Sequence, residues 1–438
     1  MKKRSAIHLI LFAALVLLAA QLSLLAILLY PHSKRKTDYS GDIQIISNIT
    51  AQLQLQLIII DKIILDNISG SKKSSDTGCP WCTEDRIVSF ATLFRELKNI
   101  EVLVRRAEDE GFKTVVFHNV HPVEKLPTGN SDIPVCVFLK HKAVIQLVLF
   151  HDREANFWWH GSIHSDPDAL HQLFSLGVNQ GFSFMNHEGA YDKFVTEKLD
   201  LHGTAFYVPK NIPDFLHDSL NSRFLECRHQ SAHQFYQKYG KDKSHEALRF
   251  SHRAWKLLSR TKTILDSIGV RFWLSSGTCL GYLRQCDIIP YGRDVDIGIF
   301  ITDYNEKIVT EFLSHGFTLK HWFGKINDSL EISFKTGDIK LDIFFFYEEE
   351  YWVWNGGTQA KTGKKFKYIF PRFTLCWTEF LELKVRVPCE TETYIEANYG
   401  KNWRIPVVHW DWKSSPPNVR ENGVWPVQEW QHVIQVYD

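Results

Sequence analysis

Two aspartates placed one residue apart, Asp294 and Asp296, are the residues of this chain best suited to chemistry. On a β-strand both carboxylates share one face, while Val295 and Ile297 point to the other face, toward a core. Two carboxylates so close repel each other unless a positive charge lies between them. Mg²⁺ prefers one or two carboxylates together with phosphate oxygens, so a divalent cation would fit here. A lone D-x-D is a weak signal because many mark solvated turns, but the apolar neighbours favour a core strand.

A third carboxylate stands in the sequence GDIKLDIFFFY, which predicts another strand with Asp342 and Lys340 on one face. If this strand lies beside the first one, Asp342 joins the two aspartates and three carboxylates converge. Asp338 and Asp303 are weaker alternatives for the third position. Asp342 could instead form a salt bridge with Arg293 or Lys340, so its role stays open at this point.

A glycine-containing turn precedes the aspartate pair and could hold an anion. After a short strand predicted over 270–274, Ser276, Gly277 and Thr278 mark the start of a helix. Free backbone N–H groups and the positive end of the helix dipole make such a start an anion site. Gly277 would let the backbone approach a phosphate closely, and a hydroxyl of Ser276 or Thr278 could donate to it. Taken alone, the turn favours an ordinary strand–turn–helix corner.

The elements around these residues predict a mixed α/β fold with its catalytic part near the C-terminus. Apolar residues recur at helical spacing over 243–269, and Gly269 ends that run. Glycine turn, helix, D-x-D strand and a later strand aspartate form the plan of the nucleotidyltransferase fold. In that fold, metal ions held by the carboxylates bridge the phosphates of a nucleotide and neutralise charge on the transferring group.

The rest of the chain divides into a stem, expected over 31–85, and an α/β domain of undetermined topology, expected over 86–242. The stem contains a small polar connector, but its earlier part, LQLQLIIIDKIILD, is too apolar for a free linker and suits a strand or helix docked on the body. The nucleotidyltransferase-like domain then occupies 243–438.

The overall composition suits a large two-domain protein, since the chain has 438 residues of which 44% are hydrophobic. The formal net charge of +1 argues against a dedicated nucleic-acid binder, because such proteins usually carry a basic face. Aromatic residues make up 13% of the chain, and a large aromatic core explains most of them.

An apolar run from Ile7 to Tyr30 follows a short basic tail at residues 1–6. A run of about 20 apolar residues can span a bilayer as a helix. The rival interpretation, a cleaved signal peptide, has a shorter apolar region of about 7–15 residues. We therefore predict an uncleaved signal anchor over 7–30, although basic residues at 34–36 weaken the argument for its orientation.

Features after the apolar run favour a lumenal body and hence a type II membrane protein. N-x-S/T glycosylation sequons occur at Asn48, Asn67 and Asn327, and the chain has eight cysteines, an even number that suits disulfides. We interpret Cys79-Pro-Trp-Cys82 as a structural disulfide, with redox chemistry the minor alternative.

Two further cysteines, Cys279 and Cys286, flank the predicted phosphate helix. They could pair with each other or with distant partners, and the sequence leaves the pairing open.

Longer motifs along the chain resemble those of the LicD-like phosphotransferases. The motif that carries the aspartates is GTCLGYLRQCDIIPYGRDVDIG. The likeness extends to LVLFHDREANFWWHG (147–161), SRFLECR (222–228), WNGGTQAKTGKKFKYIFP (354–371), YIEANYGKNW (394–403) and WDWKSSPPNV (410–419).

The resemblance implies a Golgi type II membrane enzyme that transfers ribitol 5-phosphate from CDP-ribitol with release of CMP. It also implies that the acceptor is the N-acetylgalactosamine of the O-mannosyl glycan of α-dystroglycan. Dependence on Mg²⁺ or Mn²⁺ and company with other enzymes of the same Golgi glycosylation pathway are further implications. In one respect the chain departs from its relatives, because Gly292 replaces the first aspartate of their Pro-Trp-Asp-x-Asp-x-Asp loop.

These observations combine into one hypothesis for the site. The expected metal ligands are Asp294, Asp296 and Asp342, with Asp342 also a candidate base. The expected phosphate-binding groups are Ser276, Gly277 and Thr278. Arg284 or Arg293 would offset developing charge. Lys364 and Lys365, in a basic loop after Gly356-Gly357, could grip the donor phosphates or an anionic glycan, and a solvated hairpin explains this loop about equally well.

Two other functions remain open on the sequence. The first is a glycosyltransferase that uses the D-x-D pair with a nucleotide sugar, although such an enzyme would not need the turn at Gly277-Thr278. The second is a non-catalytic scaffold for glycan enzymes, against which the three intact carboxylates argue.

Overall fold

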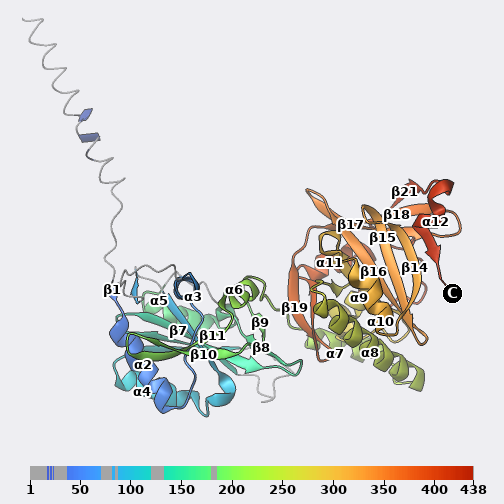
Figure 1. Cartoon of the computed structure of the whole chain (residues 1–438). Coiled ribbons are helices and arrows are strands. Elements are labelled where there is room, and N and C mark those ends of the chain that lie inside the picture. The colour runs from blue at the N-terminus through green and yellow to red at the C-terminus, as the bar shows by residue number, and fades with distance from the viewer. Residues whose placement is uncertain are drawn as a thin grey trace, which may run out of the picture.

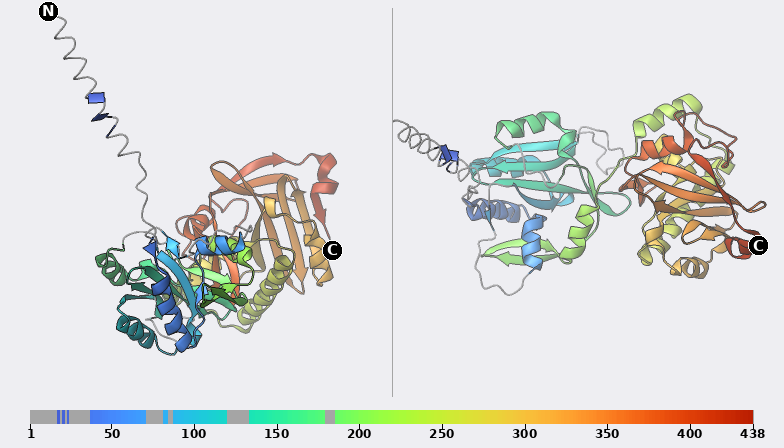
Figure 2. Two further views of the ribbon diagram at one scale, coloured as in Figure 1. Left: turned by 60° about the vertical axis from the view of Figure 1, so that its left-hand side comes forward. Right: turned by 90° about the horizontal axis from the view of Figure 1, so that it is seen from above.

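The computed structural model describes residues 17, 18, 20, 21 and 23, and the ranges 37–70, 81–83, 87–119, 133–178 and 185–437. Most of the predicted membrane anchor, the side chain of Cys82 and all of Cys79 lie outside these residues. Within the described ranges, none of the helices combines the length and apolar character that crossing a bilayer requires. The described residues form two domains, which are seen side by side in Figure 1 and in the right-hand view of Figure 2.

The first domain is built on a nine-stranded mixed sheet in the order β10-β11-β2-β4-β7-β6-β5, with β8 and β9 added beyond β7. Its strands are β2 (Ile58–Ile59), β4 (Ile87–Leu93), β5 (Lys113–Asn119), β6 (Ile133–Lys140), β7 (Val144–Asp152), β8 (Phe157–His160), β9 (Gly189–Asp192), β10 (Thr196–Leu201) and β11 (Thr204–Pro209). A separate short pair joins β1 (Thr37–Asp38) to β3 (Cys82–Thr83). The helices are α2 (Ser40–Gln52), α3 (Lys62–Ser69), α4 (Ile100–Asp109), α5 (Pro167–Ser175) and α6 (Ile212–Leu220).

Residues assigned to a stem over 31–85 are in large part integral to this first domain. Helix α2 and strand β2 bury residues from Tyr39 to Ile60 in the same hydrophobic core as the central strands. Asp61 caps α3 by accepting hydrogen bonds from the N–H groups of Ile63 and Ile64. The apolar sequence before the polar connector therefore forms a core strand and a core helix. Burial of its side chains is more favourable than their exposure to water in an extended linker.

The second domain contains another nine-stranded sheet, in the order β21-β18-β17-β16-β15-β14-β22, with β13 beside β16 and β12 beside β13. Its strands are β12 (Trp273–Leu274), β13 (Asp294–Phe300), β14 (Thr318–Lys325), β15 (Asp328–Thr336), β16 (Ile339–Glu348), β17 (Trp352–Gln359), β18 (Lys364–Pro371), β21 (Val419–Val424) and β22 (Ile434–Val436). The hairpin of β19 (Leu375–Phe380) and β20 (Leu383–Pro388) forms a small sheet of its own.

Helices pack on this sheet and carry the predicted helical segments. They are α7 (His229–Tyr239), α8 (His245–Ser267), α9 (Ser276–Gln285), α10 (Lys307–Ser314), α11 (Thr391–Tyr399) and α12 (Trp430–Val433). The helix predicted over 243–269 is confirmed as α8, whose apolar face is buried. The mixed α/β class predicted for the chain is confirmed as well.

The sequence suggested a domain boundary at residue 242. In the structure the boundary lies earlier in the chain. The core of the first domain ends at Phe224, and that of the second begins at Cys227. Cys227 forms a disulfide with Cys286 at the end of α9, which ties the start of α7 to the second domain. A second disulfide joins Cys376 to Cys389 across the β19–β20 hairpin. Among the cysteines described, Cys279 is buried and free, so it does not pair with Cys286.

A buried arginine links the two domains. Arg153, which follows β7, places its Nε 2.8 Å from an oxygen of Glu379 on β19, and its side chain has no exposed surface. The same guanidinium contacts Glu226 in the connection between the domains, at 2.8 Å. In Figure 1, β19 lies on the side of the second domain that faces the first. The first domain thus holds the β19–β20 hairpin through buried charges.

Replacement of Arg153 by Met should therefore destabilise the protein strongly, because Glu226 and Glu379 would keep their burial and lose their partner. Loss of one partner from a buried ion pair typically costs about 3–5 kcal/mol. Chemical unfolding of the full-length protein in detergent measures this change. As a control, Lys62→Met breaks an exposed pair with Asp66 and should leave the midpoint unchanged. Equal midpoints for both variants would contradict the buried anchor.

Candidate active site

Three carboxylates converge on two neighbouring strands, as the sequence predicted. Strand β13 runs parallel to β16, with Asp294 opposite Lys340 and Asp296 opposite Asp342. Each of the three aspartates offers an oxygen, and these oxygens all lie within 4.8 Å of one another. Because strand neighbours at equal register point to the same face, the period-two spacing of the first pair brings the third aspartate alongside. The weaker alternatives are excluded, because Asp338 pairs with Arg253 and Asp303 with Arg271.

The three carboxylates carry more negative charge than their surroundings neutralise. Burial, followed by the nearby carboxylates, raises the pKa of Asp296 well above its usual range. Burial and then the charge of Asp342 raise the pKa of Asp294. The ammonium of Lys340 lies 2.7 Å from one oxygen of Asp342, and the Ser333 hydroxyl donates to the other at 2.5 Å. One ammonium cannot balance three acids, and oxygen ligands of this type suit Mg²⁺ or Mn²⁺.

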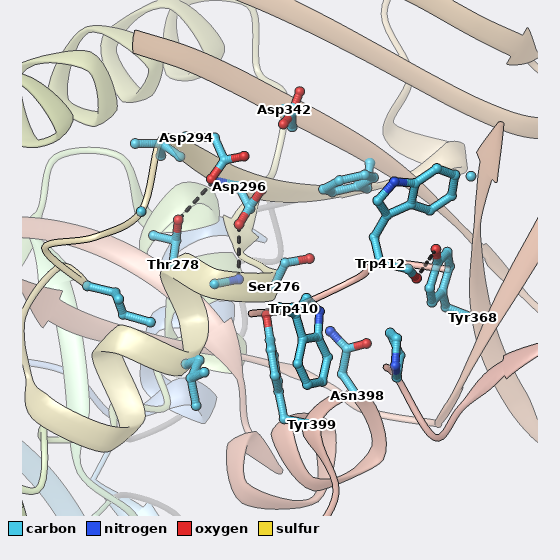
Figure 3. A pocket seen from close by; sticks show the side chains of 18 of the residues that line it. Ser276, Thr278, Asp294, Asp296, Asp342, Tyr368, Asn398, Tyr399, Trp410 and Trp412 are labelled. Carbon is cyan, nitrogen blue, oxygen red and sulfur yellow. Dashed lines mark hydrogen bonds between the residues drawn. The ribbon is translucent and has the colours of Figure 1, made fainter. Parts of the chain in front are cut away.

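The first turn of α9 holds Asp296 in place. The backbone N–H of Gly277 donates to a carboxylate oxygen of Asp296 at 2.9 Å. The N–H of Asp296 in turn donates to the Thr278 hydroxyl oxygen at 2.8 Å (Figure 3). A Cβ at position 277 would lie 3.2 Å from the Asp296 oxygen, so glycine permits this close approach. The predicted phosphate contact is therefore not supported for the Gly277 N–H, which already donates to Asp296, whereas the Thr278 hydroxyl only accepts from the Asp296 N–H and keeps its own hydrogen to donate.

All three predicted phosphate-binding residues, Ser276, Gly277 and Thr278, line the pocket. Ser276 lies at the first position of α9 with a backbone φ of 39°, in the left-handed region. This residue type rarely adopts that conformation without a structural reason, and such strain is common at functional sites.

The predicted basic residues are less involved than expected. Arg284 lines the pocket, but its guanidinium is buried against the ring of Phe235 and donates to the Gln285 side-chain oxygen at 2.9 Å. Arg293 is exposed on the turn before β13, outside the pocket lining. Arg284 is thus a structural cation at the pocket wall.

The two lysines of the basic loop also lie away from the carboxylates. Lys364 pairs with Glu421 at 3.6 Å. Lys365 pairs with Asp328 at 2.6 Å and lies over the ring of Trp425. Since each lysine has an acidic partner and neither lines the pocket, their predicted grip on the donor phosphates finds no support in this geometry.

Glu331 is a pocket residue that sequence reasoning missed. It stands on β15, two residues before Ser333, whose backbone pairs with that of Asp342 across the β15–β16 hairpin. Burial, and then the charge of Asp342, raises the pKa of Glu331 to about 8. The available signal was the tight turn at Gly337-Asp338, which places Ser333 opposite Asp342 and Glu331 two positions further along the hairpin, opposite Phe344. Glu331 therefore presents a protonated acid to the pocket near neutral pH.

The opposite wall of the pocket is aromatic. The cavity has a volume of about 740 Å³, which lies in the usual range for small-molecule sites. Tyr399 at the end of α11 lies against Trp410, with ring centroids 4.7 Å apart, and Trp412 and Tyr368 lie nearby (Figure 3). Tyr394 is a packing residue that stacks on Phe370, whereas Tyr399 lines the pocket.

Removal of one charge from the carboxylate cluster should stabilise the cation-free protein. Asp296→Asn keeps an oxygen for the Gly277 N–H and relieves repulsion, so its melting temperature in chelator should exceed that of the wild type. Mn²⁺ should stabilise the wild type by about 2.7 kcal/mol at 100 times the dissociation constant, and should leave the variant unchanged. Differential scanning calorimetry with Asp338→Asn as control measures both effects. An equal Mn²⁺ response in Asp296→Asn would exclude the cluster as the cation site.

The raised pKa of Glu331 predicts a pH dependence of stability. The folded state retains a proton on Glu331 up to about pH 8, whereas an unfolded chain loses it near pH 4.3. Stability in chelator should therefore fall as pH rises through this window. The variant Glu331→Gln should show a shallower slope of melting temperature against pH between pH 5 and pH 8. An unchanged slope would show that Glu331 is ionised in the folded protein.

Both halves of the chain match models of known protein families. A family model described as Fukutin N-terminal matches residues 36–255. A second model, described as LicD/FKTN/FKRP, nucleotidyltransferase domain, matches residues 269–390. The second match contains all three clustered aspartates and the first turn of α9.

Individual relatives agree with these models. Ribitol-5-phosphate transferase FKTN of Homo sapiens is 44% identical over 405 residues, which cover 89% of this chain and 86% of that protein. An uncharacterized protein of Caenorhabditis elegans is 29% identical over 53% of this chain and 62% of its own length. Among solved structures, the lincomycin-bound lincosamide antibiotic adenylyltransferase LnuA covers 32% of this chain and 82% of its own at 16% identity. Its TM-score of 0.22 is too low to support an argument. The extent and identity of the sequence matches establish that this chain belongs to the fukutin family, whose members carry a LicD-type nucleotidyltransferase domain.

Proposed function

We propose that this chain is a ribitol-5-phosphate transferase that uses CDP-ribitol as donor. The proposed acceptor is the N-acetylgalactosamine of the O-mannosyl glycan of α-dystroglycan, and CMP is the second product. The observation that carries the proposal is the three-aspartate cluster within a chain that matches proteins named ribitol-5-phosphate transferase over 89% of its length.

The cluster fits the charge that a phosphoryl transfer requires. Mg²⁺ or Mn²⁺ bound by Asp294, Asp296 and Asp342 would neutralise negative charge on the donor diphosphate and on the departing CMP. The Gly277 N–H fixes the Asp296 carboxylate, and Lys340 together with Ser333 fixes that of Asp342. Ligands fixed in this way need little reorganisation during the reaction.

Two acidic groups divide the remaining roles in this proposal. Both oxygens of Asp342 accept hydrogen bonds, which makes this residue a poor base and a good ligand. Glu331, which carries a proton near neutral pH in the cation-free protein, lines the same pocket and in that form can donate a hydrogen bond to a phosphate oxygen. The acceptor hydroxyl attacks the ribitol-linked phosphorus, the bond from phosphorus to CMP breaks, and the hydroxyl proton passes to solvent or to the departing phosphate.

The cellular setting is part of the same proposal. An anchor over 7–30 would hold the catalytic body on the lumenal side of the Golgi membrane, near other enzymes of the same pathway. The apolar run and the sequons after it support this orientation. A D-x-D glycosyltransferase would not account for the family match. A non-catalytic scaffold would not require the fixed geometry of the cluster.

The proposal predicts CMP release from CDP-ribitol by the full-length protein in detergent with Mn²⁺ and an acceptor glycopeptide. CDP-glycerol and UDP-sugars serve as comparison donors. Asp342→Asn should reduce kcat at least about 100-fold, since metal stabilisation of a transition state contributes several kcal/mol. Asp338→Asn, on the exposed hairpin turn, is the matched control. Turnover of a UDP-sugar in place of CDP-ribitol would favour the glycosyltransferase, and full activity of Asp342→Asn would remove the cluster from catalysis.

A further inference from the structure

The segment between α11 and β21 exposes an unusual series of apolar side chains beside the pocket. Their exposed fractions are 51% for Ile405, 50% for Val407, 72% for Val408, 37% for Trp410 and 41% for Trp412. All of them except Val408 line the pocket that contains the carboxylates. Contiguous exposed apolar surface at a pocket is a sign of ligand or partner binding, because it costs free energy in water.

Contacts on one side hold both tryptophans while their other surfaces stay open. Trp410 lies against Tyr399 at 4.7 Å between ring centroids. The backbone oxygen of Trp412 accepts a hydrogen bond from the Tyr368 hydroxyl at 2.8 Å, and its ring meets Phe366 edge-on. Rings fixed before binding lose little conformational entropy when a ligand arrives.

A pocket-lining amide lies beside these rings. The side chain of Asn398 is 7% exposed and lines the pocket, and none of the residues in the described ranges hydrogen-bonds its amide. Figure 3 shows this amide next to the ring of Trp410, on the side of the pocket away from Asp342. Because the atoms of this amide still reach solvent through the pocket, a ligand that supplies both a donor and an acceptor can replace water there.

The aromatic wall begins close to the carboxylates. A Cβ on Gly277 would lie 3.2 Å from the Asp296 oxygen and 4.0 Å from the Tyr399 hydroxyl, so this tyrosine adjoins the turn that holds Asp296. Trp410 follows one ring further out. A ring-shaped ligand on Trp410 could therefore reach the phosphorus with one substituent while its far end points to solvent.

We propose that Asn398, Trp410 and Trp412 form the subsite for the acceptor sugar, an inference that rests on the proposed function. Indole rings pack against the apolar C–H face of a pyranose, and an amide can both donate to and accept from its hydroxyl or acetamido groups. The exposure of both indoles favours the acceptor, because a glycan attached to a protein must enter from solvent. The donor diphosphate, by contrast, lies at the carboxylates. The cytosine ring of the donor is the other possible occupant, and the experiment separates the two.

Steady-state kinetics of full-length Trp410→Ala, Trp412→Ala and Asn398→Ala tests this subsite. We expect the KM for an acceptor glycopeptide ending in N-acetylgalactosamine to rise about tenfold or more, with kcat and the KM for CDP-ribitol within twofold of wild type. A tenfold change corresponds to about 1.4 kcal/mol of lost binding free energy. Trp410→Phe should restore much of the affinity. Trp352→Ala is the matched control, because Trp352 is 39% exposed on β17 and lies outside the pocket lining.

Direct binding separates failure of the subsite from failure of the proposed function. Titration calorimetry measures the affinity of the same glycopeptide and, separately, of CDP with Mn²⁺. Loss of glycopeptide binding in the variants, with CDP binding retained, supports the subsite even if the wild type fails to release CMP. An equal loss of CDP affinity would assign these residues to the cytosine ring, and unchanged affinity for both ligands would overturn the subsite altogether.

Discussion

Electrostatic repulsion among three buried carboxylates is the constraint on which the rest of this site depends. The parallel register of β13 and β16 places Asp296 opposite Asp342, with Asp294 on the same face. Burial removes the water that would otherwise screen these charges. Lys340 and the N–H of Gly277 offset part of the repulsion and fix the carboxylates in one arrangement. In the proposed function, a divalent cation held by these three aspartates would complete the charge balance and neutralise phosphate charge.

The pocket around this cluster joins two walls of different chemistry through one continuous stretch of chain. Glu379 on β19 pairs with the interdomain Arg153, and the chain then turns through β20 into α11. Helix α11 ends with Asn398 and Tyr399, which line the aromatic wall. The first domain therefore supports the same hairpin that leads to the pocket. This arrangement provides a structural reason for the N-terminal half of a chain whose charged cluster lies entirely in the second half.

Local sequence patterns predicted the parts of the site that depend on strand periodicity. They failed for residues whose contacts are made with partners distant in the sequence. Asp342 was predictable because its strand places it on one face. Glu331 depends on the register of a hairpin, which the turn at Gly337 sets. The N–H of Gly277 was expected to be free for phosphate, but a carboxylate of the protein occupies it. Lys365 likewise has an acidic partner, Asp328, 37 positions earlier in the chain. Such pairings follow from tertiary packing and leave no local signal.

The central claim is that the carboxylates of β13 and β16 share a cation that also contacts the donor diphosphate. Anomalous diffraction from crystals of the protein soaked with Mn²⁺ and CDP tests it most directly. The account predicts an anomalous peak coordinated by Asp294, Asp296 and Asp342, with phosphate oxygens of CDP in the same coordination shell. A well-ordered CDP molecule with no peak at these three aspartates, or with Mn²⁺ bound elsewhere, would contradict it.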